Sequence, residues 1–411
     1  MSNKAQSPKS LTYYTPYLSG LTLYVKRLAE ALAKKDYQIT VLSMQYDKKL
    51  PSEETIRKVK IVRAKVLGQI SKGFISLDWI IKSWQEVRKN DVIIVNLPQF
   101  EGIIPALFGK ILGKKVISMY HCEVVLPSGI LNTVVEWLLH FSHLITLSIS
   151  DKVITYTKDF ADHSKILPHF RSKLEFVYPP IIEPKINKRV QKILMDKIDL
   201  KGQFVIGLAA RLAAEKGIEY LLEAIPEIEL RIRNYESRTS KAINTPRMVA
   251  KQRLRLLRGE GIKIAIAGSL EPVGEEKYKG KILNLVEKYK DHVVFLGELK
   301  EEEMGAFYSL CDVLVLPSIN STEAFGMVQV EAMMMGVPVV ATDLLGVRVP
   351  IQKTGMGKLV PAKNSHKLAE AVIEILLNRK KYIKNKEFIK EEFSFDKTIK
   401  FYEKLVGRYF P

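Results

Sequence analysis

Short apolar runs alternate along this chain with longer segments in which apolar residues recur at every third or fourth position. The runs have the length of buried strands, and the longer segments have the period of helices that cover a sheet. The predicted strands, in chain order, are Ser10–Tyr14, Gln38–Ser43, Val92–Leu97, Lys115–Tyr120, Lys152–Thr157, Lys173–Tyr178, Phe204–Ala209, Lys263–Gly268, His292–Leu296, Val313–Leu316 and Val337–Thr342. This alternation predicts an α/β chain built on parallel sheets.

A proline-rich stretch divides the pattern into two halves. Three prolines at positions 179–184 are followed by a lysine-rich run, which is typical of a linker between domains. A chain of 411 residues is long enough for two domains of ordinary size. We therefore expect one domain over residues 1–182 and a second over residues 183–380, followed by a helical tail over residues 381–411.

The most hydrophobic window of the chain is Gly129–Ser150. It is long enough to span a membrane, but Glu136, His140 and His143 interrupt it. We expect a buried helix that runs into a loop, and a helix lying on a bilayer surface is the alternative. The first ten residues are polar, so no signal peptide is expected.

The composition is that of a globular protein, with 47% hydrophobic residues and a mean hydropathy of -0.01. Lysine and arginine exceed the acidic residues by 64 to 45, which gives a formal net charge of +19. This surplus favours anionic partners such as nucleotide diphosphates, acidic lipid headgroups or nucleic acid, and does not choose among them. Cys122 and Cys311 lie in separate apolar runs and are expected to be reduced core thiols in the cytoplasm.

The most informative stretch is the strand, helix and strand over residues 313–342. Its helix is predicted from Phe325 to Gly336, with Glu323 just before it and Glu331 inside it. Glu331 shares a helix face with methionines, so its carboxylate is expected to have a hydrogen-bond partner in the protein or in a ligand. The backbone N–H groups around the start of this helix would favour a bound phosphate.

Polar residues follow other predicted strands at the edge where open α/β sheets bind ligands. Arg211 and Lys216 stand five residues apart in one such turn, where two cations can hold a pyrophosphate and stabilise its growing negative charge. His121 follows the strand Lys115–Tyr120. Gly20 closes the first strand-to-helix loop, a geometry suited to a diphosphate.

The sequence from Glu323 to Glu331, followed by Gly336 and Pro338, resembles the signature of the retaining glycosyltransferases of family 4. The resemblance implies the GT-B fold, an α/β architecture of two Rossmann-like parallel-sheet domains facing an interdomain cleft. It implies that the first domain binds the acceptor and the second the nucleotide-sugar donor, and that the terminal helix returns to the first domain. Ser19 departs from the pattern, which usually has a second glycine before Gly20.

The resemblance also implies roles for individual residues. His121 would face the donor sugar near the reacting carbon, Glu323 would hold sugar hydroxyls, and Glu331 would accept hydrogen bonds from the ribose hydroxyls. The catalytic candidates are His121, Glu323, Arg211 and Lys216. The donor-binding candidates are Gly20, Arg211, Lys216, Gly268, Leu299, Glu323, Ala324, Phe325, Gly326, Met327, Val328 and Glu331.

The implied reaction transfers a hexose from a UDP-, GDP- or ADP-sugar to a hydroxyl of a saccharide or lipid-linked acceptor. The acceptor hydroxyl would attack from the front face with retention of configuration, and we identify no covalent nucleophile. No metal or other cofactor is expected, because the chain contains no Asp-x-Asp motif and no recognised metal-ligand spacing. Synthesis of cell-surface polysaccharide or glycolipid would be the setting.

The segment 227–261 is longer and more basic than expected between a helix and the next strand, and is predicted to be an inserted cationic helix or hairpin. It is either a solvated insertion or a contact with anionic lipid or a polyanionic acceptor. Contact with lipid would place the protein at the inner face of the cytoplasmic membrane. Two other functions remain open: a different reaction on the same fold, as in epimerases or phosphorylases, and a non-catalytic scaffold that binds polyanions. Nucleic acid is not an expected partner, because no known nucleic-acid-binding motif occurs.

Overall fold

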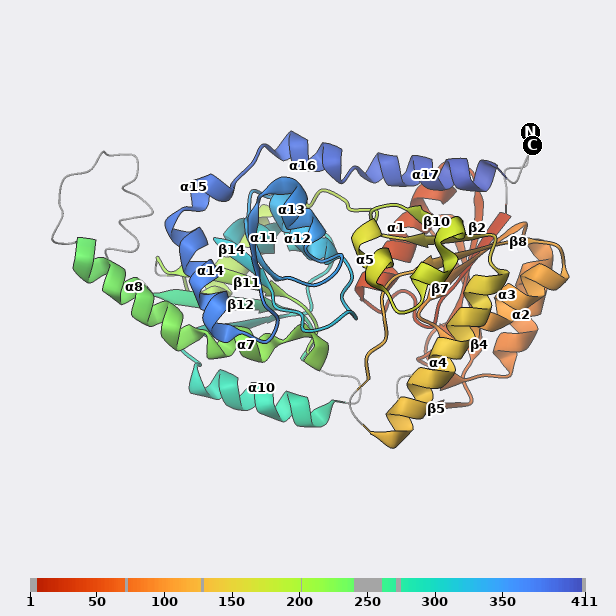
Figure 1. Cartoon of the computed structure of the whole chain (residues 1–411), viewed down its shortest axis with the longest axis horizontal. Helices are drawn as coiled ribbons and strands as arrows, with labels where there is room; N and C mark the ends of the chain where they lie inside the picture. Colours follow the sequence, from red (N-terminus) through yellow and green to blue (C-terminus); the bar gives the residue numbers. More distant parts are fainter. Residues whose placement is uncertain are drawn as a thin grey trace. The chain divides into compact units, whose positions relative to one another are not determined.

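A computed structural model describes residues 6–70, 73–126, 129–200, 202–239, 261–270 and 275–408. Contacts divide the chain into two compact units, unit 1 (Met1–Pro180 with Phe393–Pro411) and unit 2 (Ile181–Glu392). Each unit contains a largely parallel sheet with helices, so the chain has the α/β class that the sequence predicts (Figure 1). The unit boundaries lie at residues 180 and 392, against the expected 182 and 380, since the segment before residue 392 packs within unit 2.

Unit 1 contains the following elements: β1 (Gln6–Ser10), α1 (Gly20–Lys34), β2 (Gln38–Gln45), β3 (Glu53–Ile56), β4 (Val59–Lys65), β5 (Gly68–Ile70), β6 (Gly73–Ile75), α2 (Asp78–Lys89), β7 (Val92–Leu97), η1 (Phe100–Gly102), α3 (Ile103–Ile111), β8 (Lys115–Tyr120), α4 (Ile130–Ile149), β9 (Lys152–Thr155), α5 (Lys158–His163), η2 (Leu167–Lys173), β10 (Leu174–Phe176) and α17 (Phe395–Gly407). Its main sheet has the order β10-β9-β8-β7-β1-β2-β4-β3. Within the described residues the paired strands of this sheet are parallel, except β3 with β4, which are antiparallel.

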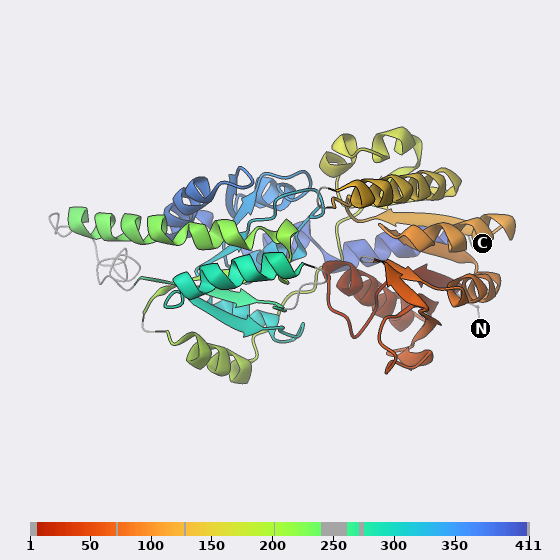
Figure 2. The same cartoon turned by 90° about the horizontal axis from the view of Figure 1, so that it is seen from below.

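Helices cover both faces of the unit 1 sheet. On one face α3 packs closely, since a Cβ added to Gly109 would lie 2.8 Å from Val116 of β8. On the other face α1 and α17 lie side by side in both views (Figures 1 and 2). There the Tyr24 hydroxyl lies 2.6 Å from the Tyr402 hydroxyl, and both approach the sulfur of Met119 in β8. The last helix of the chain is thus part of the core of unit 1.

Unit 2 contains the following elements: α6 (Lys188–Ile198), β11 (Phe204–Ala209), η3 (Ala214–Lys216), α7 (Ile218–Glu223), α8 (Ile225–Thr239), β12 (Ile262–Ala267), α10 (Glu276–Lys288), β13 (Val293–Gly297), α11 (Met304–Leu310), β14 (Val313–Leu316), α12 (Met327–Met334), β15 (Val339–Thr342), α13 (Val349–Thr354), β16 (Gly357–Val360), α14 (Ser365–Leu377), α15 (Arg379–Tyr382) and α16 (Lys386–Glu392). Its strands are parallel in the order β13-β12-β11-β14-β15-β16.

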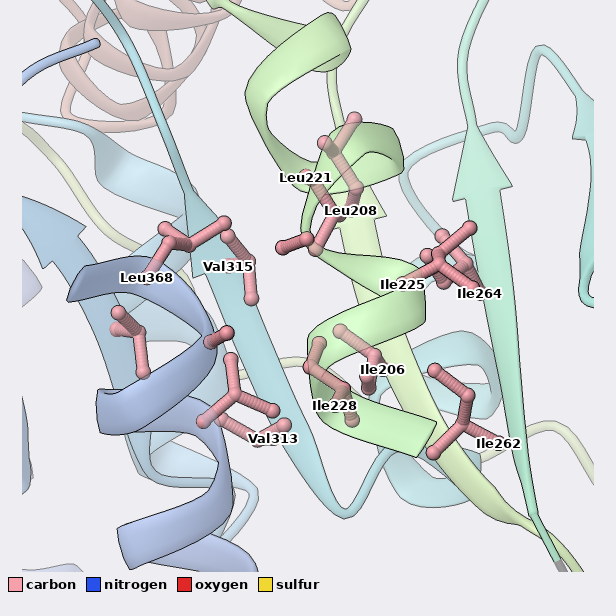
Figure 3. Close-up of a cluster of buried hydrophobic side chains, with 14 of the residues drawn as sticks. Ile206, Leu208, Leu221, Ile225, Ile228, Ile262, Ile264, Val313, Val315 and Leu368 are labelled. Carbon is pink, nitrogen blue, oxygen red and sulfur yellow. The ribbon is translucent and has the colours of Figure 1, made fainter. Parts of the chain in front are cut away.

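The core of unit 2 lies between the central strands and the helices α7, α8 and α14 (Figure 3). Ile206, Ile264 and Val315 point from the sheet toward Ile228 of α8 and Leu368 of α14. Because both faces of the central strands are covered, their sequences are nearly continuous apolar runs. This is why β11, β12 and β14 were predicted to within a residue or two.

Several expected elements differ from the structure. The first strand is Gln6–Ser10, whereas Ser10–Tyr14 was expected. The aromatic residues that suggested a strand, Tyr13 and Tyr14, lie after its end, and Tyr13 packs against Tyr17 with ring centroids 4.6 Å apart. The tail after residue 380 consists of separate helices.

The expected insertion 227–261 also needs correction. Its beginning belongs to α8, whose Ile228 and Ile232 are buried in the core, and Arg231 of this helix forms ion pairs with Glu227 and Glu370. Residues 227–239 are therefore helical, as one of the two expected forms, but they belong to a core helix and not to an insertion. Residues 240–260 lie outside the described residues.

The hydrophobic window was expected to be a buried helix running into a loop. It forms α4, one continuous helix from Ile130 to Ile149, and much of its outer side is exposed. Among the helices that the structure describes, none is both long and apolar enough to cross a membrane.

Candidate functional site

The candidate site in unit 2 lies at the carboxyl ends of β11 and β14. The chain extends the sheet from β11 to β12 and β13 and then returns to the other side of β11 with β14, β15 and β16. The order of strands therefore reverses between β11 and β14. In open α/β sheets, ligands bind outside the carboxyl ends of the strands at such a switch point. The loops over residues 210–217 and 317–326 leave the sheet here.

Four charged side chains from these two loops form adjacent ion pairs. Arg211 Nη2 lies 2.6 Å from Glu215 Oε1, and Lys216 Nζ lies 2.8 Å from Glu323 Oε2. The side chains of all four are partly buried. The structure thus brings together three of the predicted catalytic residues, Arg211, Lys216 and Glu323. It adds Glu215, which sequence reasoning missed although it stands directly before Lys216.

Backbone contacts hold the two loops against each other. The Ile319 N–H donates to the Glu215 carbonyl at 3.0 Å. Gly217, with φ 60°, lies so close to the other loop that an added Cβ would be 2.3 Å from the Pro317 carbonyl oxygen. A left-handed φ and this close approach both favour glycine. Gly217 thereby allows the loop that carries Lys216 to approach the loop that carries Glu323.

The beginning of α12 is arranged by two side chains. Glu323 Oε1 accepts a hydrogen bond from the Gly326 N–H at 2.9 Å, so this carboxylate bridges Lys216 and the N-cap of the helix. Gln329 Nε2 donates to the Phe325 carbonyl at 2.5 Å. The side chains of Ala324 and Phe325 are buried, whereas Met327 and Val328 are only partly buried. The predicted helix from Phe325 to Gly336 is shorter in the structure, Met327–Met334.

Glu331 has the hydrogen-bond partner that its apolar helix face requires. Its side chain is 5% exposed, and Tyr308 of α11 donates its hydroxyl to Glu331 Oε2 at 2.8 Å. The expectation of a partner is confirmed, whereas the ribose contact stays a prediction. Tyr308 could not be found from the sequence because it stands 23 positions from Glu331 and lies in an apolar helix.

The two remaining unit 2 candidates lie after neighbouring strands of the same edge. Gly268 follows β12, and a Cβ there would lie 1.9 Å from the Ala210 carbonyl oxygen. The turn is joined to the β11 loop, since the Leu212 N–H donates to the Ser269 carbonyl at 2.9 Å. Leu299 follows β13 and is partly buried. Both residues are placed where a ligand at the carboxyl edge would meet backbone atoms.

His121 of unit 1 is buried with hydrogen bonds at both ring nitrogens. Asn96 Nδ2 donates to the Ser10 carbonyl, so Asn96 Oδ1 faces the ring and accepts from His121 Nε2 at 3.0 Å. His121 Nδ1 then accepts from the Tyr156 hydroxyl at 2.5 Å. Burial lowers the pKa of His121 to about 3. The imidazole is neutral near pH 7, and this geometry favours a positioning role over proton transfer.

Gly20 is the first residue of α1, and Ser19 is its N-cap. The Ser19 hydroxyl accepts from the Thr22 N–H at 3.2 Å, and Thr22 Oγ1 accepts from the Ser19 N–H at 2.8 Å. This capping box satisfies two backbone donors and accounts for serine at the position where a second glycine was expected. Gly20 itself is exposed at the helix start.

The described residues contain no group of three or more His, Cys, Asp and Glu side chains arranged to hold a metal ion. The metal independence of the reaction stays a prediction.

Two family models match the chain, one over most of each unit. The model described as "Glycosyl transferases group 1" matches residues 190–392, and the model described as "Glycosyltransferase Family 4" matches residues 18–182. Together the two models cover the segments that contain every predicted site residue.

Individual relatives agree with this assignment. An uncharacterized glycosyltransferase of Methanocaldococcus jannaschii is 26% identical over 412 residues, which cover 94% of each chain. A phosphatidyl-myo-inositol mannosyltransferase of Mycobacterium leprae is 38% identical over 112 residues, which cover 26% of this chain and 29% of the relative.

Solved structures share the fold over the whole chain. Sucrose-phosphate synthase from Thermosynechococcus elongatus superposes with a TM-score of 0.70 at 18% identity and covers 99% of both chains. HepE of Anabaena, solved in complex with UDP and glucose, gives a TM-score of 0.72 at 15% identity, covering 98% of this chain and 100% of that chain. At these identities the similarity establishes the GT-B fold.

Proposed function

Because the chain belongs to the group 1, family 4 glycosyltransferases, we propose that it transfers a hexose from a nucleotide-diphosphate sugar to an acceptor hydroxyl with retention of anomeric configuration. The observation that carries this proposal is the cluster of Arg211, Lys216 and Glu323 at the switch point of the unit 2 sheet. A sugar nucleotide has the complementary charges, since its diphosphate is anionic and its sugar presents hydroxyl donors.

Each residue of the cluster has a distinct part in the proposed reaction. Arg211 and Lys216 hold the diphosphate and stabilise the negative charge that grows on it as the glycosidic bond lengthens. Glu323 accepts hydrogen bonds from sugar hydroxyls, and Glu331 accepts them from the ribose. The observed ion pairs mean that the diphosphate competes with Glu215 and Glu323 for the two cations. These carboxylates keep both cations in place before the donor binds.

Backbone groups complete the proposed donor site. The N–H groups over residues 324–327 would face the diphosphate, and Gly268 and Leu299 would line the base. Met327 and Val328, at the start of α12, would also contact the donor. In unit 1, Gly20 would lie near the donor and His121 would position the donor sugar. The chemistry requires no metal in this proposal, because the two cations supply the charge stabilisation.

The acceptor in this proposal is a saccharide or a lipid-linked molecule, used in cell-surface polysaccharide or glycolipid synthesis at the cytoplasmic membrane. The net charge of +19 supports an anionic surface nearby. The mannosyltransferase relative, whose name includes phosphatidyl-myo-inositol, supports a lipid-linked acceptor. The nucleotides UDP, GDP and ADP are all candidates.

A thermal-shift panel with chelator present tests the donor site. Ligands that bind only the native state raise its apparent stability, by about 2.7 kcal/mol at a hundred times Kd. We expect one of the UDP-, GDP- and ADP-sugars to stabilise the wild type, and Arg211→Ala to lose this effect. Arg189→Ala, an exposed arginine of α6, should retain it. Stabilisation by a polyanion but by no sugar nucleotide would instead favour a scaffold.

A further inference from the structure

Three neighbouring helices of unit 1 expose large apolar side chains on their outer side. Helices α2, α3 and α4 pack side by side over one face of the sheet (Figures 1 and 2). Six of the exposed side chains define what we call the α2–α4 face: Ile81, Trp84, Ile111, Val134, Trp137 and Phe141. Isolated exposed apolar residues are ordinary, but an apolar surface that extends over three adjacent helices indicates an interaction site.

Helix α4 exposes large apolar side chains along part of its outer side. Val134, Trp137 and Phe141 follow one another at helical spacing along its exposed side, and Trp137 is 66% exposed. The rings of Trp137 and Phe141 stack with centroids 5.9 Å apart. The helix meanwhile buries Ser142, whose hydroxyl donates to the Phe100 carbonyl at 2.9 Å, and Thr146. The helix buries Leu147 as well, but the three large apolar side chains on its outer side are not expected of a surface that faces water alone.

The three helices carry both acids and bases, and the two differ in how they are paired. The acids of the three helices are engaged: Asp78 accepts from the Lys65 N–H, buried Glu86 pairs with Lys60 and Lys89, and Glu136 accepts from the Leu126 N–H. Arg88 and Lys110 are exposed, and neither forms an ion pair with an acid of the described part of the chain. The face is therefore apolar with a cationic border.

We propose that the α2–α4 face docks unit 1 on a bilayer surface that contains anionic lipids, with α4 lying in the plane of the interface. Exposed tryptophan and phenylalanine beside lysine and arginine are the side chains that such an interface favours. A second copy of the chain fits less well. A two-fold contact would add the exposed bases Arg88 and Lys110 of both copies to one interface, whereas an anionic bilayer compensates them directly.

This inference deepens the proposed function. It assigns the membrane contact to the apolar face of unit 1, whereas the sequence pointed to the basic segment 227–261. An enzyme held on this face would meet acceptors that are themselves anchored in the bilayer.

Vesicle flotation of the full-length protein tests the inference. The wild type should float with phosphatidylcholine vesicles that contain phosphatidylglycerol, and less with phosphatidylcholine alone or at high salt. Trp137→Ser with Phe141→Ser should lower the partition coefficient by at least about tenfold, since two aromatic rings no longer enter the interface. The matched control, Ile193→Ser with Phe388→Ser, removes exposed apolar side chains of unit 2 and should float like the wild type.

Two further measurements test the contribution of charge to vesicle binding and the depth of Trp137 in the bilayer. Lys110→Glu should lower binding to anionic vesicles by at least about fivefold, whereas Lys277→Glu, an exposed lysine of α10, should not. Brominated lipid should quench the tryptophan fluorescence of the bound wild type, and Trp137→Phe should reduce this quenching. These results would place Trp137 within the bilayer interface.

Three outcomes would overturn the inference. The first is a wild type that fails to float with anionic vesicles, and the second is a variant Trp137→Ser with Phe141→Ser that floats like the wild type. The third is a wild-type dimer in light scattering that the same variant converts to a monomer. Thermal shifts with sugar nucleotides on the same proteins separate this question from the proposed function. Intact donor stabilisation without flotation would reject the membrane face alone. Flotation without any donor stabilisation would reject the proposed function alone.

Discussion

Lys9 of β1 is a lysine whose side chain is buried inside unit 1. Its side chain is 1% exposed, and its amino group has no hydrogen-bond partner among the described residues. Lys9 Nζ lies 6.0 Å from the centroid of the Tyr402 ring. Burial lowers the pKa of Lys9 well below its ordinary value, so that the folded protein favours the neutral amine. Lys9 therefore opposes folding.

Replacing Lys9 by methionine should stabilise the protein. Lys9→Met keeps the length of the side chain and removes an unsatisfied buried amine, which should raise the free energy of unfolding by about 1–3 kcal/mol at neutral pH. The unfolded chain binds a proton on Lys9 up to about pH 10.5 and the folded chain releases it at lower pH, so wild-type stability rises with pH between these values. The advantage of Lys9→Met should accordingly shrink toward pH 10.

Urea unfolding followed by circular dichroism at neutral and alkaline pH measures both effects. Lys380→Met, at an exposed position of α15, is the control and should change the free energy of unfolding little. A Lys9→Met variant less stable than the wild type would show that the amine has an acceptor in the folded protein.

Single residues also show where sequence reasoning reaches its limit. Arg211, Lys216 and Glu323 could be identified from the sequence because each follows a predicted strand or precedes a predicted helix. Glu331 could be identified because it is an acid on an apolar helix face. The partners Tyr308 of Glu331 and Tyr156 of His121 could not, since 23 and 35 positions separate them. Contacts across that distance depend on how helices and strands pack, for which the local sequence has no signal.

Helices and strands could be predicted from the sequence where burial alone explains their pattern of apolar residues. The strands of unit 2 are buried on both faces, so their apolar runs mark them directly. Helix α4 was expected to be buried, but an apolar sequence does not say how much of a helix the rest of the fold covers, and its outer side is exposed. The start of α8 was taken for an insertion because its arginines are prominent, although Ile228 and Ile232 anchor it in the core.

The contact between the two site loops gives a prediction for Gly217. Gly217→Ala adds a methyl group 2.3 Å from the Pro317 carbonyl oxygen at a left-handed φ, so the loops must separate. We expect a loss of at least about 2 kcal/mol in the free energy of unfolding, together with weaker donor binding as Lys216 moves from Glu323. Urea unfolding and thermal shift with the stabilising sugar nucleotide measure the two effects.

Gly280 provides the matched control for this substitution. It lies inside α10, and an added Cβ meets nothing within 4 Å. Gly280→Ala should therefore stabilise the protein by about 0.5–1 kcal/mol, because alanine favours the helix. If Gly217→Ala behaved like Gly280→Ala, the close approach of the loops would not hold in solution.

At the scale of the whole molecule, the two units differ in how the chain builds them. Unit 2 is one continuous segment, Ile181–Glu392, whereas unit 1 needs both ends of the chain. Helix α17 completes unit 1 through the buried Tyr24 and Tyr402 hydroxyls, the Thr398 hydroxyl that donates to the Tyr178 carbonyl at 3.0 Å, and the Lys35–Glu403 ion pair. The last helix of the chain therefore packs into unit 1, and we expect unit 1 to need it for stability.

This difference predicts how fragments of the chain behave. Residues 181–392 should fold alone with a cooperative urea transition, because their core is self-contained. Residues 1–180 should lack a cooperative transition until a peptide of residues 393–411 is added, since α1 and the sheet otherwise lose the cover of α17. In that peptide Tyr402→Ala should abolish the rescue, whereas Phe401→Ala, at a half-buried position, should weaken it less. If residues 1–180 unfolded cooperatively without the peptide, α17 would not be needed for unit 1 to fold.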